Sequence, residues 1–270
     1  PGPFRLADHG RPELAFLWKN LLSTWPYFTP RVWLGCAALV VAAGLWLQAQ
    51  PALHEIATAT AWMILIFAGY VLLVGPQFAR QDIRSDLAQA DILKTYPLAG
   101  WQIILGELLA PAAILTGVLW LLLLGAAILL RPVDDAEGGM TAAEHFVGAG
   151  ALAIVMPALA TLQLLVPNAA ALLFPSWFQA ARTRGGGPEV MGQRMIYFFA
   201  QLLMMAAALL PAMAVAVGTA LALHWIIGVA PAIGCAAFSA LAVLVGEVWC
   251  GVWWLGGRFE RLDLSAELRS

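Results

Sequence analysis

The reactive and metal-binding side chains of this chain are scattered, and they form no recognisable catalytic motif. The glycine run at 185–187 is not followed by the Lys and Ser or Thr that a nucleotide phosphate loop requires, so it predicts a flexible turn. His54 and Glu55 begin like a zinc-protease helix, but Thr58 stands where the second histidine should be. The three cysteines and four histidines share no metal-ligand spacing. The sequence therefore predicts no catalytic centre, no metal site and no cofactor on this chain.

Four polar side chains stand inside apolar segments, where a buried charge or amide needs a partner. Glu247 has two interpretations: a residue on a substrate or ion path, or a carboxylate that is hydrogen-bonded to another helix or reaches the interface. The same alternatives apply to Glu107, which we expect closer to the interface. We expect the side chains of Gln163 and Gln201 to form hydrogen bonds between helices.

The segments that carry these residues are too apolar for a soluble core. Apolar residues make up 62% of the 270 residues and charged residues 11%, against roughly 25% charged in soluble domains. Runs of about 20 apolar residues are long enough to cross a hydrocarbon layer of about 30 Å. We therefore predict an all-α membrane protein with a single transmembrane domain over residues 1–270. Its six spans are expected at about 32–47, 56–78, 105–130, 146–166, 195–223 and 225–255.

The positive charges are sorted by side. With six spans, thirteen of the fourteen Lys and Arg residues fall in alternate gaps, and only Arg131 falls on the other side. Because loops rich in Lys and Arg stay in the cytoplasm during insertion, both chain ends are predicted to be cytoplasmic. Outside the spans there is no basic patch with interleaved aromatic residues, so membrane lipids are expected partners and nucleic acid is not.

Shorter elements flank the spans. Residues 1–30 are predicted to be cytoplasmic or interfacial, with a helix over 13–25 whose tryptophans favour headgroup depth. We expect Pro157 and Pro167 to break the fourth span, and residues 256–270 to form a cytoplasmic tail. The apolar face expected for the N-terminal helix consists of Leu14, Leu17, Leu21 and Trp25.

The segment 80–97, between the second and third spans, is the most charged part of the cytoplasmic side. Asp82 or Ser85 is expected to cap a short helix there. Ile83, Leu87 and Ala90 then share an apolar face, and the charges point elsewhere. The pattern predicts an amphipathic helix on which a soluble partner could dock.

This segment also resembles a known family. It contains Arg-x-Asp-x-x-x-Asp-Leu from Arg80 and Leu-Lys-x-x-Pro-Leu from Leu93, a combination similar to the connection between spans two and three of ABC-2-type transporter permeases. The opening residues 17–20, the middle residues 167–177 and 192–194, and the closing residues 256–265 resemble the same group of bacterial exporter permeases.

The resemblance implies the membrane subunit of an ATP-driven exporter in the bacterial cytoplasmic membrane. Such a subunit has six spans, an interfacial N-terminal helix and a coupling helix between spans two and three. It pairs with a second permease unit and with separate ATPase subunits, which carry the ATP and Mg²⁺. On this basis the residues expected to contact the ATPase are Arg80, Asp82, Arg84, Asp86, Asp91 and Lys94.

Two other functions stay open from the residues alone. Glu247 could serve an ion- or proton-coupled carrier, and the chain could be a membrane scaffold that transports nothing. Because it begins at Pro1, we also expect the chain to be either processed or one piece of a longer protein. The sequence does not indicate a substrate.

Overall fold

The computed structural model of the chain describes residues 11–24, 29–78, 82–87, 90–130, 140–175 and 188–262, and within these ranges it contains helices and turns but no strand. A short 3-10 turn, Pro51–Leu53, precedes α3. The helices in chain order are α1 (Pro12–Thr24), α2 (Pro30–Gln48), α3 (His54–Phe78), α4 (Ile83–Asp86), α5 (Ala90–Leu93), α6 (Gly100–Leu129), α7 (Ala142–Leu173), α9 (Pro188–Ile227) and α10 (Val229–Arg261).

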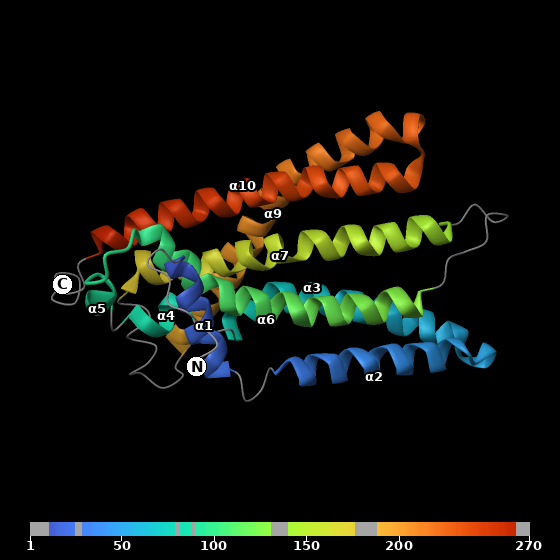
Figure 1. Ribbon diagram of the computed structural model, residues 1–270, viewed down its shortest axis with the longest axis horizontal. Coiled ribbons are helices and arrows are strands. Elements are labelled where there is room, and N and C mark those ends of the chain that lie inside the picture. The colour runs from blue at the N-terminus through green and yellow to red at the C-terminus, as the bar shows by residue number, and fades with distance from the viewer. Residues whose placement is uncertain are drawn as a thin grey trace, which may run out of the picture.

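Six of these helices are long and apolar enough to cross a membrane: α2, α3, α6, α7, the part of α9 from Phe198, and α10. Most of them run along the long axis of the molecule, and α9 crosses obliquely behind α7 (Figure 1). Large apolar side chains on their outer surface are exposed, among them Trp62 at 57% and Met63 at 69%, as expected for a surface that faces lipid. The predictions of an all-α fold and of six apolar spans are confirmed by this length and composition.

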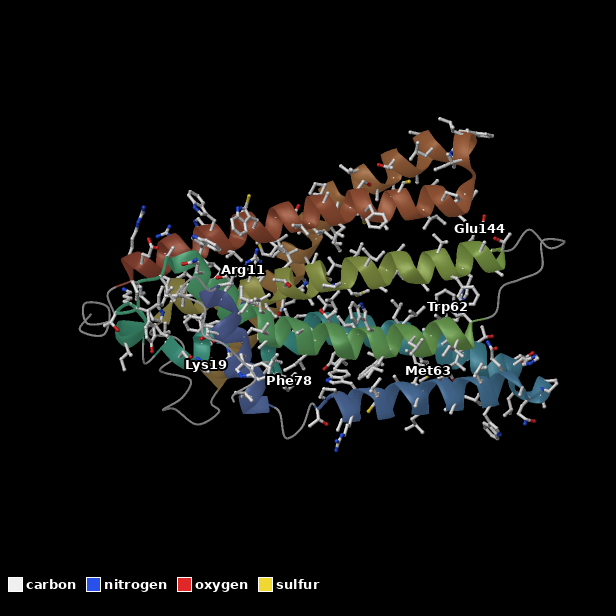
Figure 2. The ribbon with its side chains drawn as sticks, in the orientation of Figure 1. Arg11, Lys19, Trp62, Met63, Phe78 and Glu144 are labelled. Carbon is white, nitrogen blue, oxygen red and sulfur yellow. The ribbon has the colours of Figure 1, made fainter. Side chains whose placement is uncertain are left out.

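Charge is sorted along the bundle. Arg11 and Lys19 lie at the end where α1, α4 and α5 are found, and Glu144 lies at the opposite end (Figure 2). Arg11 directly precedes α1. The other Lys and Arg residues in the described ranges belong to α1, α4, the turn after α5, or the ends of long helices on this same side. We call it the charged end.

The boundary between the last two spans differs from the prediction. The sequence placed it near His224, but α9 continues to Ile227 and α10 begins at Val229. Gly228 joins them with a φ of 85°, a backbone conformation that glycine adopts without steric cost. Helix α10 also continues past the predicted end of the sixth span, as far as Arg261.

The predicted breaks in the fourth span are also wrong, because α7 runs without interruption through Pro157 and Pro167. Proline cannot donate a hydrogen bond to the carbonyl four residues earlier. For Pro157 that carbonyl belongs to Ala153, and the indole Nε1 of Trp120 donates to it instead at 2.8 Å. A side chain of α6 thus supplies the missing donor.

The buried residues of α1 lie outside the apolar face that its leucines form. Phe16 and Asn20 are buried at 9% and 5% exposure, whereas Leu14 is 51% exposed. Phe16 lies close against Gly106 of α6, where an added Cβ would be 2.7 Å from the Cβ of Phe16. The helix therefore packs on α6 through one aromatic ring and one amide.

Three apolar clusters lie among the described residues, and the smallest consists of Ala57, Ala61 and Leu129. The two larger clusters join most of the helices. One lies at the charged end and joins Phe16, the segment of α4 and α5, and the facing residues of α6, α7 and α10. The other lies farther along the bundle and joins α3, α6, α7, α9 and α10. Helix α2 contributes no buried residue to either cluster.

Candidate functional site

The segment between α3 and α6 is anchored by its apolar side chains. Ile83, Leu87, Ala90 and Leu93 are all buried, at 1%, 5%, 0% and 7% exposure, in the cluster at the charged end. The Asp82 side chain accepts a hydrogen bond from the backbone N–H of Arg84. Of the two residues predicted to cap this helix, Asp82 is therefore the N-cap. Instead of one amphipathic helix, the segment forms two short helices, α4 and α5.

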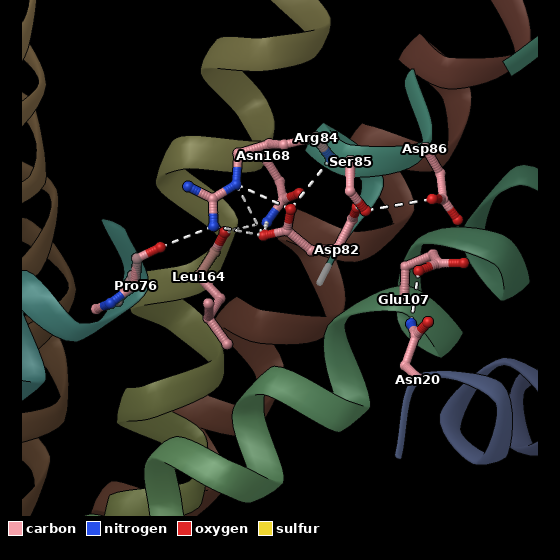
Figure 3. A network of polar contacts seen from close by, with 9 residues as sticks. All are labelled: Asn20, Pro76, Asp82, Arg84, Ser85, Asp86, Glu107, Leu164 and Asn168. Atoms are coloured by element: carbon pink, nitrogen blue, oxygen red, sulfur yellow. Dashed lines mark hydrogen bonds and ion pairs between the residues drawn. The ribbon is translucent and has the colours of Figure 1, made fainter. Parts of the chain in front are cut away.

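Asp82 is the centre of the first polar network, which Figure 3 shows. Its carboxylate is fully buried and accepts hydrogen bonds from the guanidinium of Arg84, with Nε at 2.9 Å and Nη2 at 2.7 Å from Oδ2. The amide Nδ2 of Asn168 in α7 donates to the same oxygen at 2.9 Å. A buried carboxylate persists only with such partners.

The same guanidinium reaches α3. Nη2 of Arg84 donates to the backbone oxygen of Pro76 at 2.7 Å, near the C-terminus of α3 (Figure 3). Carbonyls in the last turn of a helix have no partner within the helix, so they are available to a side-chain donor. Through Asp82 and Arg84, the segment is bonded to both α3 and α7.

A second network joins α1 to α4 and α6. Nζ of Lys19 contacts Asp86 Oδ2 at 2.6 Å and Glu107 Oε1 at 3.0 Å, and Nδ2 of Asn20 donates to Glu107 Oε2 at 2.7 Å. Burial lowers the pKa of Lys19, but its hydrogen bonds to Asp86 and Glu107 and their negative charges outweigh that effect, so the pKa lies above its ordinary value. Glu107, 1% exposed, is thus hydrogen-bonded between helices.

The C-terminal end of α10 is also hydrogen-bonded to this part of the chain. Nζ of Lys94 donates to the backbone oxygen of Leu262, and the backbone N–H of Gly100 donates to Glu260 Oε1 at 2.7 Å. Gly100 and Gly256 let the backbones of α6 and α10 meet, because an added Cβ on either one would collide with backbone atoms of the other helix.

The residues predicted to contact a partner are thus divided by the structure. Asp82, Arg84 and Lys94 point inward and hold the segment in place, and Asp86 is 24% exposed and bound to Lys19. Arg80 and the side chain of Asp91 lie outside the described residues. A direct contact of Asp82 with a partner would require its network to open.

Sequence reasoning missed the exposed apolar side chains of this segment. Ile92 is 59% exposed and Tyr96 is 49% exposed. Ile92 lies in the four-residue helix α5 and Tyr96 in the turn that follows it, so no regular helical pattern in the sequence indicated their exposure.

The polar residues within the spans, unlike those at the charged end, have buried atoms that lack hydrogen-bond partners among the described residues. Gln163 is 1% exposed, and neither of its amide atoms has a hydrogen-bond partner among the described residues, so the predicted bond between helices is not formed in this structure. Gln201 accepts from Nε2 of Gln77 at 3.5 Å, but its own Nε2 has no partner there. One buried carboxylate oxygen of Glu247 likewise has none.

In the described part of the chain, no three His, Cys, Asp or Glu residues come together as a metal site. The chemistry at the charged end is ion pairing and hydrogen bonding between helices. No family model matches the chain, and no curated protein or solved structure matches it either.

Proposed function

We propose that this chain is the membrane-spanning subunit of an ATP-driven exporter, and that residues 82–99 receive the movement of a separate ATPase. The observation that carries the proposal is the set of bonds from this short segment to four other helices. They reach α3 through Arg84, α7 through Asp82, α1 through Asp86 and the end of α10 through Lys94.

A connection that only joins two spans needs no such bonds. Coupling between an ATPase and a transport path requires an element that moves together with several spans, because each site must favour the same state of the bundle. The segment meets that requirement, since its buried face and its polar side chains are both fixed to the spans. Displacing it would displace α3 and α7 together.

The exposed side of the segment offers a surface to the ATPase. Ile92 and Tyr96 are large, exposed and located at the charged end. Apolar and aromatic side chains exposed to water are typical of protein–protein contacts. The positive charge at this end favours a cytoplasmic location, where ATP is available. On this proposal both chain ends are cytoplasmic, the membrane is the bacterial inner membrane, and a second permease unit completes the transport path.

The test is to isolate the full chain from the membranes of its own cells in mild detergent and to measure Mg²⁺-dependent ATP hydrolysis in the purified fraction. We expect activity with wild type and a loss of about tenfold with Ile92→Asp or Tyr96→Ala, since a central interface residue contributes about 1.4 kcal/mol or more. Trp225→Ala is the matched control, because Trp225 is 86% exposed on α9 at the opposite end.

Two results would contradict the proposal. One is a wild-type fraction that hydrolyses no ATP. The other is activity that survives Ile92→Asp and Tyr96→Ala together. Both substitutions are at exposed positions, so the variants are expected to fold, and their elution in size-exclusion chromatography checks this.

One observation favours a second function, an ion-coupled carrier. Glu247 lies within α10, and one of its carboxylate oxygens is buried without a partner among the described residues. A carboxylate in that position is suited to binding a proton or cation. The carrier would show transport that depends on an ion gradient and stops in Glu247→Gln, whereas an ATP-driven exporter needs no gradient.

A further inference from the structure

Two buried glutamines in the spans have hydrogen-bonding groups that meet no partner. Gln163 of α7 is 1% exposed and Gln201 of α9 is 2% exposed. Among the described residues, Gln163 has two unmatched amide atoms and Gln201 has an unmatched Nε2. Nε2 of Gln77 in α3 donates to Oε1 of Gln201 at 3.5 Å. We call Gln77, Gln163 and Gln201 the polar seam.

The direction of Gln163 follows from the other faces of α7. Asn168 marks the face toward α4, Ala153 marks the face toward α6 by accepting from Trp120, and Leu165 marks the face toward α10, where it lies against Gly251. The remaining long helices packed on α7 are α3 and α9. Gln163 is almost fully buried, and α3 and α9 are the neighbours on the side of α7 that these three residues leave.

The faces of α7 and α9 that carry these two glutamines are otherwise apolar. Met156 and Ala160 share the helical face of Gln163, and Met205 and Leu209 share the face of Gln201. All four belong to the apolar cluster farther along the bundle. Each glutamine therefore stands about one turn from that cluster, on its side toward the charged end.

Unmatched buried amides are rare because each costs about 1–3 kcal/mol of desolvation, so their presence calls for a missing partner. The amides are uncharged. The atoms without a partner are two donors, Nε2 of Gln163 and Nε2 of Gln201, and one acceptor, Oε1 of Gln163. Such groups suit a neutral ligand group that both donates and accepts hydrogen bonds. The methionines beside them adapt readily to an apolar body of varied shape.

We propose that the polar seam binds the head group of an uncharged amphiphile, a hydroxyl or a carboxamide, while the apolar body of that ligand lies along Met156, Met205 and Leu209. The inference rests on the proposed function, for which it names the class of cargo. The glutamines are buried in this structure, so the ligand enters a minor open state of the bundle in which α3, α7 and α9 separate, and this state forms without ATP.

The experiment uses the full chain in nanodiscs of phosphatidylcholine and phosphatidylglycerol, without ATP. The probe is a dodecanol that carries a photoactivatable diazirine beside its hydroxyl, and the labelled residues are mapped by mass spectrometry. We expect labelling at the facing residues of α7 and α9, suppressed by excess 1-dodecanol or dodecanamide and not by dodecanoate or dodecane.

Substitutions then test the amides. Gln163→Leu and Gln201→Leu should each lower labelling about fivefold, the effect of losing one neutral hydrogen bond. Ser239→Ala is the matched control, because Ser239 also lies within a span but is hydrogen-bonded to Ala236 and Thr219. If Gln163→Leu does not fold, Gln163→Met and Gln201→Leu give the same comparison.

Labelling spread evenly over the lipid-facing helices would overturn the proposal, as would labelling that Gln163→Leu and Gln201→Leu leave unchanged. Water would then be the partner of these amides. The assay needs neither ATP nor a partner subunit. Its failure therefore leaves the exporter proposal intact, and a chain without an associated ATPase that still shows seam labelling would contradict the exporter proposal alone.

Discussion

The charged end and the polar seam bury polar side chains to the same degree but satisfy them differently. Asp82 is 0% exposed and Gln163 is 1% exposed. Asp82 meets Arg84 and Asn168, whereas Gln163 meets no hydrogen-bond partner in the described ranges. Since burial is equal, the difference lies in the partners that the fold provides.

This difference separates a structural role from a binding role. Oδ1 of Asn168 has no partner among the described residues, but the buried charges of Asp82 and Arg84 are paired. A buried network with paired charges fixes the positions of the helices that carry it, because breaking it leaves a charge without a partner. An unsatisfied pair of amides lowers the stability of the closed bundle and favours any state or ligand that supplies the missing bonds. In a transporter, the first arrangement would transmit movement and the second would respond to cargo.

Asp82→Ala has the largest effect expected among the substitutions that test this difference between the two regions. The substitution removes the carboxylate that neutralises the largely buried Arg84, whose side chain is 10% exposed. We expect the free energy of unfolding to fall by about 3–5 kcal/mol, measured by denaturant unfolding in detergent. Asp86→Ala is the control: its ion pair with Lys19 is half exposed on the lysine side, and we expect less than about 1 kcal/mol. Equal losses would contradict the central role of Asp82.

A second substitution tests how closely the charged end is packed. Gly256→Ala places a methyl group against the backbone of Trp101, which cannot move aside as a side chain could. We expect a loss of about 2–3 kcal/mol from overpacking. Gly257→Ala meets nothing within 4 Å, and it should instead stabilise α10 by about 0.5–1 kcal/mol through helix propensity. Thermal unfolding of the two variants should shift in opposite directions, and a shared direction would refute the close contact.

A third pair of substitutions sharpens the comparison within one helix. Gln163→Leu removes amide atoms that have no partner, so the free energy of unfolding should rise by about 1 kcal/mol. Asn168→Leu, five residues away in α7, removes a donor to a buried carboxylate and should lower it by about 1.5–3 kcal/mol. If Gln163→Leu destabilises the protein as Asn168→Leu does, Gln163 already has a partner and the distinction between the two regions fails.

The fold was largely predictable because the length and apolarity of a span are local properties of the sequence. The helix boundary at Gly228 was missed because the apolar pattern continues through Trp225 to Ile227, and only the backbone geometry identifies the glycine as the turn. The continuous α7 was missed for a different reason. The donor that compensates for Pro157 is Trp120, which belongs to another helix.

The candidate site was less predictable, since its bonds join residues far apart in the sequence. Asp82 and Asn168 are 86 positions apart, and Lys19 and Glu107 are 88 positions apart. The sequence identified Asp82 and Glu107 as notable but gave no sign of their partners. A charge pattern alone does not distinguish a carboxylate that faces a partner protein from one that is bonded within the bundle.

The smallest expected effect concerns pH at α1. Because the pKa of Lys19 is raised above 10.5, the stability it contributes is fully present below that pH and is lost as the pH rises through the higher folded pKa. Lys19 is half exposed, so the contribution is below about 1 kcal/mol. After correction for intrinsic exchange rates, the protection of α1 amides from hydrogen exchange should therefore stay constant between about pH 7 and pH 9. Lys19→Met should lower that protection slightly and equally across the range. A protection that falls between those pH values in wild type would mean that some group other than Lys19 holds α1 on α6.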